Sequence, residues 1–155
     1  MVSFTIVLIL LVGIPYVIVE FKKDEKQHPV SRHFEPSEID FMDGHDFEYY
    51  CASILKKNGF QSVQVTPGSG DQGVDIVATF DGCRYAIQCK RYSKDLGNTP
   101  VQEVNSGRSF YHCDRAVVMT NRYFTKGAID LAAATDVELW DRDRLFEMIA
   151  AMEDD

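Results

Sequence analysis

The chain has 155 residues, of which 45% are hydrophobic, and carries a formal net charge of −8. This length is typical of a single folded domain, and the acidic balance argues against a broad basic surface for nucleic acid. The four cysteines form no Cys-x-x-Cys pair and accompany no histidine cluster, which argues against a zinc site and favours small packing residues.

The N-terminal region contains an uncharged run at residues 2–19, VSFTIVLILLVGIPYVIV. As a helix this run spans about 27 Å, near the lower limit for crossing a bilayer. No positively charged segment precedes it, so we favour a retained transmembrane helix over a signal peptide or a buried helix. Lys22, Lys23 and Lys26 follow the run. By the positive-inside rule they predict a single-pass membrane protein whose C-terminal part is cytoplasmic.

Residues 20–42 are expected to form a linker, because they are mostly polar, contain two prolines and show no sustained periodicity. The folded domain is then expected over residues 43–152, where helical and strand patterns alternate. The predicted helices cover 43–57, 99–111, 125–135 and 141–152, and the predicted strands cover 62–66, 74–80, 84–92, 115–120 and 137–140. This order predicts an α/β domain with a mixed sheet.

Short motifs support two of these boundaries. Asn58-Gly59 is a signal for the end of a helix. Thr99-Pro100-Val101-Gln102 has the form of a capping box with proline at the first helical position. Both motifs place helix ends where the hydrophobic periodicity does.

The strands at 74–80 and 84–92 are joined at Asp81-Gly82, which predicts a tight hairpin. With this pair at the tip, Asp75 lies opposite Gln88, and their Cβ atoms are about 4.5–5.5 Å apart. Lys90 is two residues further along, so it shares that face, about 7 Å from Gln88. One face of the hairpin is therefore expected to gather a carboxylate, an amide and an ammonium group.

These three groups suit metal-assisted hydrolysis of a phosphodiester. Asp75 would bind Mg²⁺, a hard cation that takes oxygen ligands, and the amide oxygen of Gln88 would bind it directly or through water. Lys90 would orient the attacking water or stabilise charge on the phosphate. Asp75 alone would give the Mg²⁺ site a single carboxylate ligand, which is a small number. Glu48 and Asp71 are therefore candidates for a second carboxylate ligand. The alternative is a solvated polar pair at a strand end, with Glu48 a solvated helix residue.

Five segments occur in the order found in a known family: HDFEYYCASILKKNGF, GSGDQGVDIVA, YAIQCKRY, RAVVMTNRYFTKGAIDLAA and VELWDRDRL. From about Gly44 to Leu145 the chain resembles the catalytic domain of the Mrr family. These are type IV, modified-DNA restriction endonucleases of the PD-(D/E)xK, or restriction-endonuclease-like, superfamily. The resemblance implies an α-β-β-β-α-β core with a mixed central sheet flanked by helices. It also implies Mg²⁺-dependent cleavage of double-stranded DNA, and Mn²⁺ is expected to substitute.

The resemblance also assigns residues. Asp75 matches the metal-binding acid of the family, Gln88 and Lys90 match its Q-x-K variant, and Glu48 matches its helix acid. Gln102 would contact DNA or metal in such a fold, although capping accounts for it equally well. Residues 84–94 contain no acid, and their basic side chains besides Lys90 are candidates for DNA contact: Arg84, Arg91 and Lys94.

The leading hypothesis is a membrane-anchored, Mg²⁺-dependent DNA endonuclease for restriction or defence against foreign or modified DNA. Other hypotheses remain open: an inactive DNA-binding or sensing module of the same fold, a membrane-tethered interaction domain, and an RNA, junction or repair nuclease. A homodimer is also left open. Sequence or methylation specificity does not follow from the resemblance.

Overall fold

The computed structural model describes residues 36–68, 70 and 72–152. The membrane span expected at residues 2–19 and residues 20–35 of the expected linker lie outside this described part. Among the helices of the described part, none combines the length and apolar character needed to cross a membrane.

The described chain contains every helix and strand expected for the domain, together with one short helix that was not expected. The elements are α1 Pro36–Ile39, α2 Gly44–Lys57, β1 Gln61–Val65, β2 Ile76–Phe80, β3 Cys83–Lys90, α3 Thr99–Phe110, β4 Arg115–Thr120, α4 Lys126–Thr135, β5 Val137–Trp140 and α5 Arg142–Ala150. The α/β class and the mixed sheet predicted from the sequence are confirmed.

The short helix α1 falls in the segment expected to be a linker. Ile39 is fully buried and Met42 is nearly so, and both join the apolar cluster around α2 and α5. Residues 36–42 therefore belong to the folded domain. A helix of four residues is too short to show a hydrophobic periodicity. The burial of Ile39 and Met42 could therefore not be predicted from the mostly polar sequence around them.

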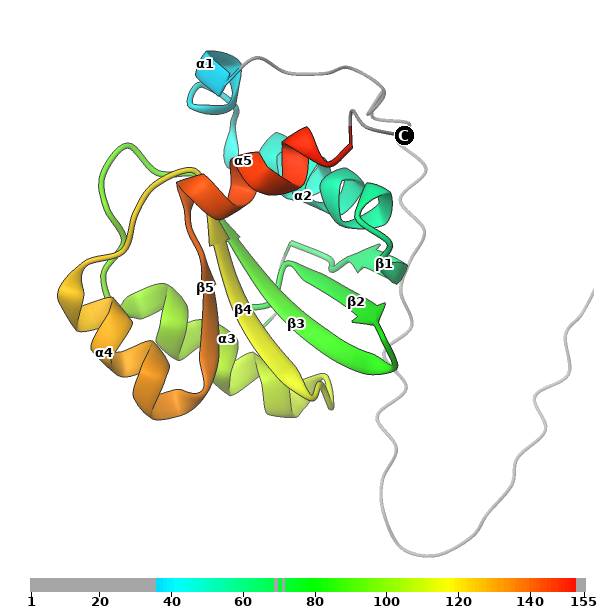
Figure 1. Cartoon of the computed structure of the whole chain (residues 1–155). Coiled ribbons are helices and arrows are strands. Elements are labelled where there is room, and N and C mark those ends of the chain that lie inside the picture. The colour runs from blue at the N-terminus through cyan, green and yellow to red at the C-terminus, as the bar shows by residue number, and fades with distance from the viewer. Residues whose placement is uncertain (1–35, 69, 71, 153–155) are drawn as a thin grey trace, which may run out of the picture.

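The five strands form one sheet in the order β1-β2-β3-β4-β5 (Figure 1). Strands β1, β2 and β3 are antiparallel neighbours, whereas β3, β4 and β5 run parallel. Parallel neighbours need a crossover connection, and α3 and α4 supply these connections on one face of the sheet (Figure 1). Helices α2 and α5 cover the opposite face (Figure 1).

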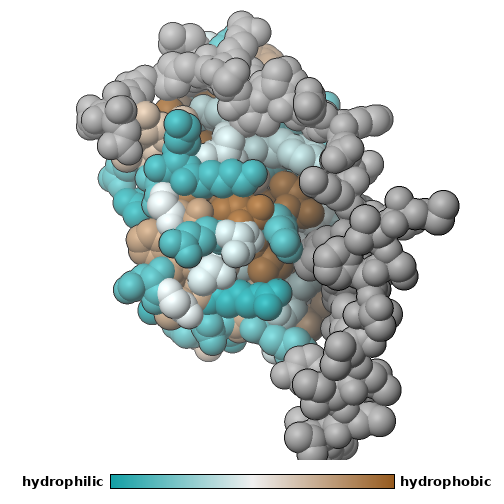
Figure 2. All heavy atoms as spheres, turned by 90° about the vertical axis from the view of Figure 1, so that its right-hand side faces the viewer, coloured by the Kyte–Doolittle hydropathy of each residue, from teal (hydrophilic) through white to brown (hydrophobic). Residues whose placement is uncertain are grey.

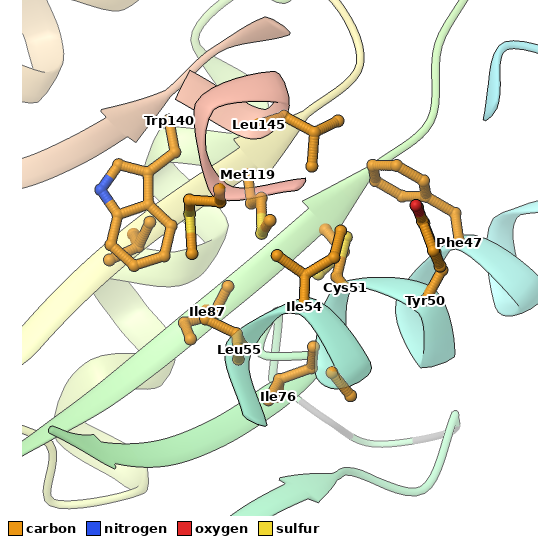
Figure 3. Packing of buried hydrophobic residues seen from close by; sticks show 14 of the residues in the cluster. Phe47, Tyr50, Cys51, Ile54, Leu55, Ile76, Ile87, Met119, Trp140 and Leu145 are labelled. Carbon is orange, nitrogen blue, oxygen red and sulfur yellow. The ribbon is translucent and has the colours of Figure 1, made fainter. Parts of the chain in front are cut away.

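Each face of the sheet has its own apolar core. Figure 3 shows the core under α2, where Ile54 and Leu55 lie near Ile76 and Ile87 of the strands and Leu145 of α5 closes the cluster. The other core packs α3 and α4 against the sheet, and its main members are Val77, Ala86, Val101, Val104, Val118 and Ala128. The sheet is therefore buried on both faces, as is usual where strands run parallel.

The edge strand β1 is the least buried strand of the sheet. Figure 2 shows the side of the molecule at the right of Figure 1, where polar side chains surround a small apolar area. In β1 the pairing with β2 shifts between Gln61 and Gln64, and Ser62 has a positive φ of 50°. Such a bulge interrupts the row of hydrogen-bonding groups that an edge strand presents to other chains.

Candidate active site

The hairpin of β2 and β3 has the predicted register, and this register positions the candidate site. Phe80 pairs with Cys83 and Ile76 pairs with Ile87. The turn residues Asp81 and Gly82 have φ values of 49° and 76°, as a two-residue type I′ turn requires. Alternation along β3 puts Gln88 and Lys90 on the same face as Ala86, the face covered by α3.

Asp75 and Gln88 form the buried centre of the site. Asp75 is 7% exposed and Gln88 is 1% exposed. The side-chain amide of Gln88 donates a hydrogen bond to Oδ2 of Asp75, and the backbone N–H of Cys89 donates to the same oxygen at 2.7 Å. Because both donors are built into β3, the carboxylate is held in one orientation.

The backbone around Asp75 departs from the predicted strand. The sequence placed Asp75 inside a strand, but β2 begins at Ile76. The Asp75 N–H donates to the carbonyl of Ile87 at 2.9 Å, and its carbonyl accepts from the N–H of Thr66 at 2.9 Å. The Thr66 hydroxyl also donates to the carbonyl of Val74 at 2.6 Å. The ladder stops early because the Asp75 side chain takes the Cys89 N–H.

The second polar atom of Gln88 has no hydrogen-bond partner among the described residues. Its Oε1 is buried and accepts no hydrogen bond within the part of the chain that the structure describes. The amide cannot be reversed, since only its NH₂ group can donate to the Asp75 carboxylate. An unsatisfied buried acceptor costs about 1–3 kcal/mol, so this oxygen fits a position that faces a cation or a water.

These oxygen atoms have the chemistry of ligands for a divalent metal. A carboxylate and an unpartnered amide oxygen are ligands of the hard type that Mg²⁺ prefers. Within residues 36–68, 70 and 72–152, no three His, Cys, Asp or Glu side chains form a metal-binding group. The Asp75–Gln88 pair alone therefore offers one carboxylate.

Lys90 lies at the edge of the site and is paired with an acid from α3. Its side chain is 26% exposed, and its Nζ lies 3.5 Å from Oε2 of Glu103. Sequence reasoning did not single out Glu103. The one available signal was its position beside the apolar stripe of Val101 and Val104, which packs α3 on the sheet face that carries Lys90.

Glu48 approaches from the other side of the sheet. It lies on α2, and its Oε2 is 3.2 Å from Nδ1 of His45. Burial raises the pKa of the Cys89 thiol well above its ordinary value, and the neighbouring Cys51 and the carboxylates of Asp75 and Glu48 raise it further. Glu48 and Asp75 therefore both act electrostatically on Cys89. Asp71, the other candidate acid, lies outside the described residues.

The candidate DNA contacts are not all in one place. Arg91 and Lys94 follow directly after Lys90, and Gln102 is exposed on α3 next to Glu103. Arg84 is paired with Thr79 near the turn of the hairpin, which puts the length of β3, roughly 20 Å, between it and Lys90. Arg84 therefore lies away from Lys90 along β3, and its contact with DNA stays a prediction.

The predicted capping box at the start of α3 does not form. The N-cap is Asn98 in a helical conformation, with no side-chain cap hydrogen bond. Capping therefore does not account for Gln102.

A polar network that sequence reasoning did not foresee holds the chain just after Lys90. Asn121 is fully buried. Its side chain accepts from the N–H of Tyr92 at 2.9 Å and donates to the carbonyl of Tyr92 at 3.1 Å and to Asp40 at 2.8 Å. Arg142 donates to the same Asp40 oxygen at 2.7 Å. The network joins the ends of β3 and β4 to α5 and to the residue after α1.

Residues 39–149 match the family model of the Mrr catalytic domain, described as a restriction endonuclease. The chain belongs to this family. A stretch of 55 residues is 38% identical to the crossover junction endodeoxyribonuclease of Sulfolobus islandicus rod-shaped virus 1. That stretch covers 34% of this chain and 46% of the viral protein, so the match spans less than half of that relative.

Solved structures agree with the family assignment. The DNA modification-dependent restriction endonuclease AspBHI superposes with a TM-score of 0.56 at 14% identity, over 77% of this chain and 37% of that one. A protein of unknown function superposes with a TM-score of 0.53 at 23% identity, over 70% of this chain and 65% of that one. At these identities the likeness shows the fold, a restriction-endonuclease-like α/β core whose mixed sheet is flanked by helices.

Proposed function

We propose that this member of the restriction endonuclease family is a divalent-metal-dependent DNA endonuclease that hydrolyses phosphodiester bonds. The observation that carries the proposal is the buried, unpartnered amide oxygen of Gln88 beside the Asp75 carboxylate. Lys90 lies two residues along the same strand face, where it reaches the edge of the site. Most buried polar atoms have a hydrogen-bond partner, so this oxygen favours a functional role.

Each residue has a distinct role in this proposal. Asp75 and the amide oxygen of Gln88 would hold the divalent cation. When bound, Mg²⁺ supplies a Lewis acid for the phosphate and lowers the pKa of a bound water. The Lys90 ammonium would stabilise the charge that develops on the phosphate. The hydrogen bonds from Gln88 and Cys89 hold the Asp75 carboxylate before substrate arrives, so it does not reorganise during the reaction.

Cleavage of supercoiled plasmid by the full-length chain tests the proposal. We expect nicked and linear products with Mg²⁺ or Mn²⁺ and none with EDTA. Lys90→Ala should lower kcat by at least about 100-fold, since removal of one charge-stabilising group costs this much. Lys94→Ala is the matched control, because Lys94 is exposed nearby and should affect mainly KM. Activity that survives Lys90→Ala would show that the site is misplaced.

The DNA structure that the enzyme prefers is a second question. The viral relative is named for crossover junctions, which favours branched DNA as a second candidate substrate. A four-way junction and a linear duplex of the same sequence, each with and without methylated cytosine, separate these substrates. Preference for the junction would support a junction nuclease, and preference for methylated duplex would support restriction of modified DNA. An RNA duplex of the same sequence tests the RNA alternative.

Gel retardation distinguishes a catalytically inactive DNA-binding module from an active nuclease. Such a module would retard DNA in a gel but leave it intact with Mg²⁺ or Mn²⁺. An interaction domain that meets no nucleic acid would show no salt-dependent retardation at all.

We also propose that residues 2–19 anchor the chain in a membrane with the nuclease domain on the cytoplasmic side. The support is the uncharged run and the lysines that follow it. In bacterial cells that express the chain, the protein should stay with the membrane after alkaline extraction. Deletion of residues 2–19 should release it. Release of the undeleted chain would contradict the proposal.

A further inference from the structure

Glu103 lies at the Lys90 end of the site, and one of its oxygens accepts no hydrogen bond from the described residues. Its Oε2 is buried and accepts no hydrogen bond from the described residues, although the side chain as a whole is 40% exposed. Within the described part of the chain, the Lys90 ammonium lies 3.5 Å from this oxygen. A charge-assisted hydrogen bond measures about 2.7–2.9 Å, so this ion pair leaves the oxygen without a close donor.

Two buried oxygens that accept no hydrogen bond from the described residues therefore lie on the same face of the sheet. Gln88 and Lys90 alternate onto the face that α3 covers, and Glu103 reaches that face from α3. The amide oxygen of Gln88 and Oε2 of Glu103 are both buried without a hydrogen bond among the described residues. A buried anionic oxygen is costly unless it meets positive charge. A divalent cation between these oxygens and Asp75 would satisfy both.

The position of Glu103 depends on close backbone contacts made by two glycines. A Cβ on Gly73 would lie 2.6 Å from Cβ of Glu103 and 2.9 Å from its carbonyl carbon. A Cβ on Gly107, one helical turn further along α3, would lie 2.6 Å from the carbonyl oxygen of Gln72. Only glycine permits this approach at both points. The loop that precedes Asp75 and the helix that carries Glu103 are therefore in close backbone contact.

We propose that Glu103 supplies a second carboxylate to the divalent-cation site formed by Asp75 and Gln88. This inference rests on the proposed metal-dependent function and adds a ligand from α3. In this structure the Lys90 ammonium pairs with the Glu103 carboxylate. Metal binding would give the Glu103 carboxylate a divalent partner and free the ammonium for the phosphate.

Binding of Mn²⁺ alone to the full-length chain tests the inference without reference to cleavage. Free Mn²⁺ is measured by electron paramagnetic resonance, and bound metal is also read as the rise in Tm that it produces. Glu103→Gln should weaken Mn²⁺ binding by at least about tenfold, and Asp75→Asn should weaken it as well. Glu147→Gln is the matched control, because it removes an exposed carboxylate on α5 and should leave Mn²⁺ binding unchanged.

Each outcome decides between the two proposals. If Asp75→Asn loses Mn²⁺ binding while Glu103→Gln keeps it, Glu103 is no ligand and the proposed function stands. If the unsubstituted chain binds no Mn²⁺, both proposals fail. Folding of each variant is checked by its Tm in EDTA. If Glu103→Gln does not fold, Glu103→Asp replaces it, since it keeps the charge and shortens the side chain. Mn²⁺ affinity equal to that of the unsubstituted chain would then overturn the inference.

Discussion

Gln88 is the glutamine of the Q-x-K motif that the resemblance to the Mrr family assigns to the metal site. Its amide does two things that a carboxylate cannot do together, since it donates to Asp75 and still presents an oxygen. The pair is therefore satisfied without metal on one side and open to a cation on the other. A carboxylate at this position would face Asp75 in a buried site with the same charge.

Gln88→Glu tests these two roles of the Gln88 amide, the hydrogen bond to Asp75 and the oxygen that faces a cation. With EDTA the free energy of unfolding of the variant should be roughly 1–3 kcal/mol lower than that of the unsubstituted chain, because two buried carboxylates repel each other and a hydrogen bond is lost. With Mn²⁺ the variant should gain more stability than the unsubstituted chain, since the cation meets an additional negative charge. Urea unfolding in EDTA and in Mn²⁺ measures both effects. Gln61→Glu adds the same charge at an exposed position on β1 and should show neither effect, whereas equal behaviour of the two variants would contradict this account of Gln88.

At the scale of elements, the hairpin could be predicted and the placement of α3 could not. The Asp81-Gly82 turn sets the register of its own two strands, so local residues were enough to bring Asp75 and Gln88 together. The Lys90–Glu103 contact depends instead on how closely α3 packs on the loop before Asp75. The distance between α3 and this loop depends on tertiary packing, and the spacing of residues along the sequence does not predict it. The hints of a close contact were the glycine-rich loop that contains Gly73 and a glycine within the predicted helix, Gly107.

Gly107→Ala tests the contact between α3 and the loop. In an isolated helix the change would stabilise by about 1 kcal/mol, but here the new methyl group meets Val74 and the carbonyl oxygen of Gln72. Overpacking typically costs 1–3 kcal/mol, so we expect a net loss of about 1–2 kcal/mol and weaker Mn²⁺ binding. Chemical denaturation measures the first effect and metal titration the second. Gly44→Ala is the control, because a Cβ on Gly44 has no neighbour within 4 Å. A Gly107→Ala variant as stable as Gly44→Ala would refute the close contact.

At the scale of the whole molecule, Asp40 connects segments that are far apart in sequence. Its carboxylate binds Asn121 after β4 and Arg142 at the start of α5, and Asn121 in turn holds the backbone of Tyr92 just after Lys90. The short helix α1 thus braces the end of the sheet where the candidate site lies. The sequence assigned this segment to a linker because its contacts are distant and leave no local pattern.

The ionisation of Asp40 makes the stability of the fold depend on pH in the acid range. Burial alone would raise its pKa, but hydrogen bonds from Arg142 and Asn121 outweigh this and lower the pKa below its ordinary value of 3.8. A lowered carboxyl pKa adds stability that is present above the unfolded-state pKa and lost as pH falls through the folded-state pKa. Asp40→Asn should therefore destabilise by about 0.5–1.5 kcal/mol near pH 7 and flatten the decline of Tm below pH 4. Tm measured from pH 3 to 7 checks this, with the exposed Asp95→Asn as control. An unchanged pH profile in Asp40→Asn would contradict the assignment.

The net charge of −8 limits how the whole molecule can hold DNA. Few basic side chains lie beside the site, so electrostatic attraction should come mainly from the metal and from Arg91 and Lys94. With the Lys90→Ala variant, which leaves DNA intact, we expect weak binding in EDTA and tighter binding in Mg²⁺. The logarithm of the binding constant should fall with the logarithm of salt concentration at a slope of about −2, the value for two phosphate contacts. A further Lys94→Ala change should reduce the slope by about one, whereas Lys57→Ala on α2 should not. Tight binding in EDTA with a slope several times steeper would contradict this account.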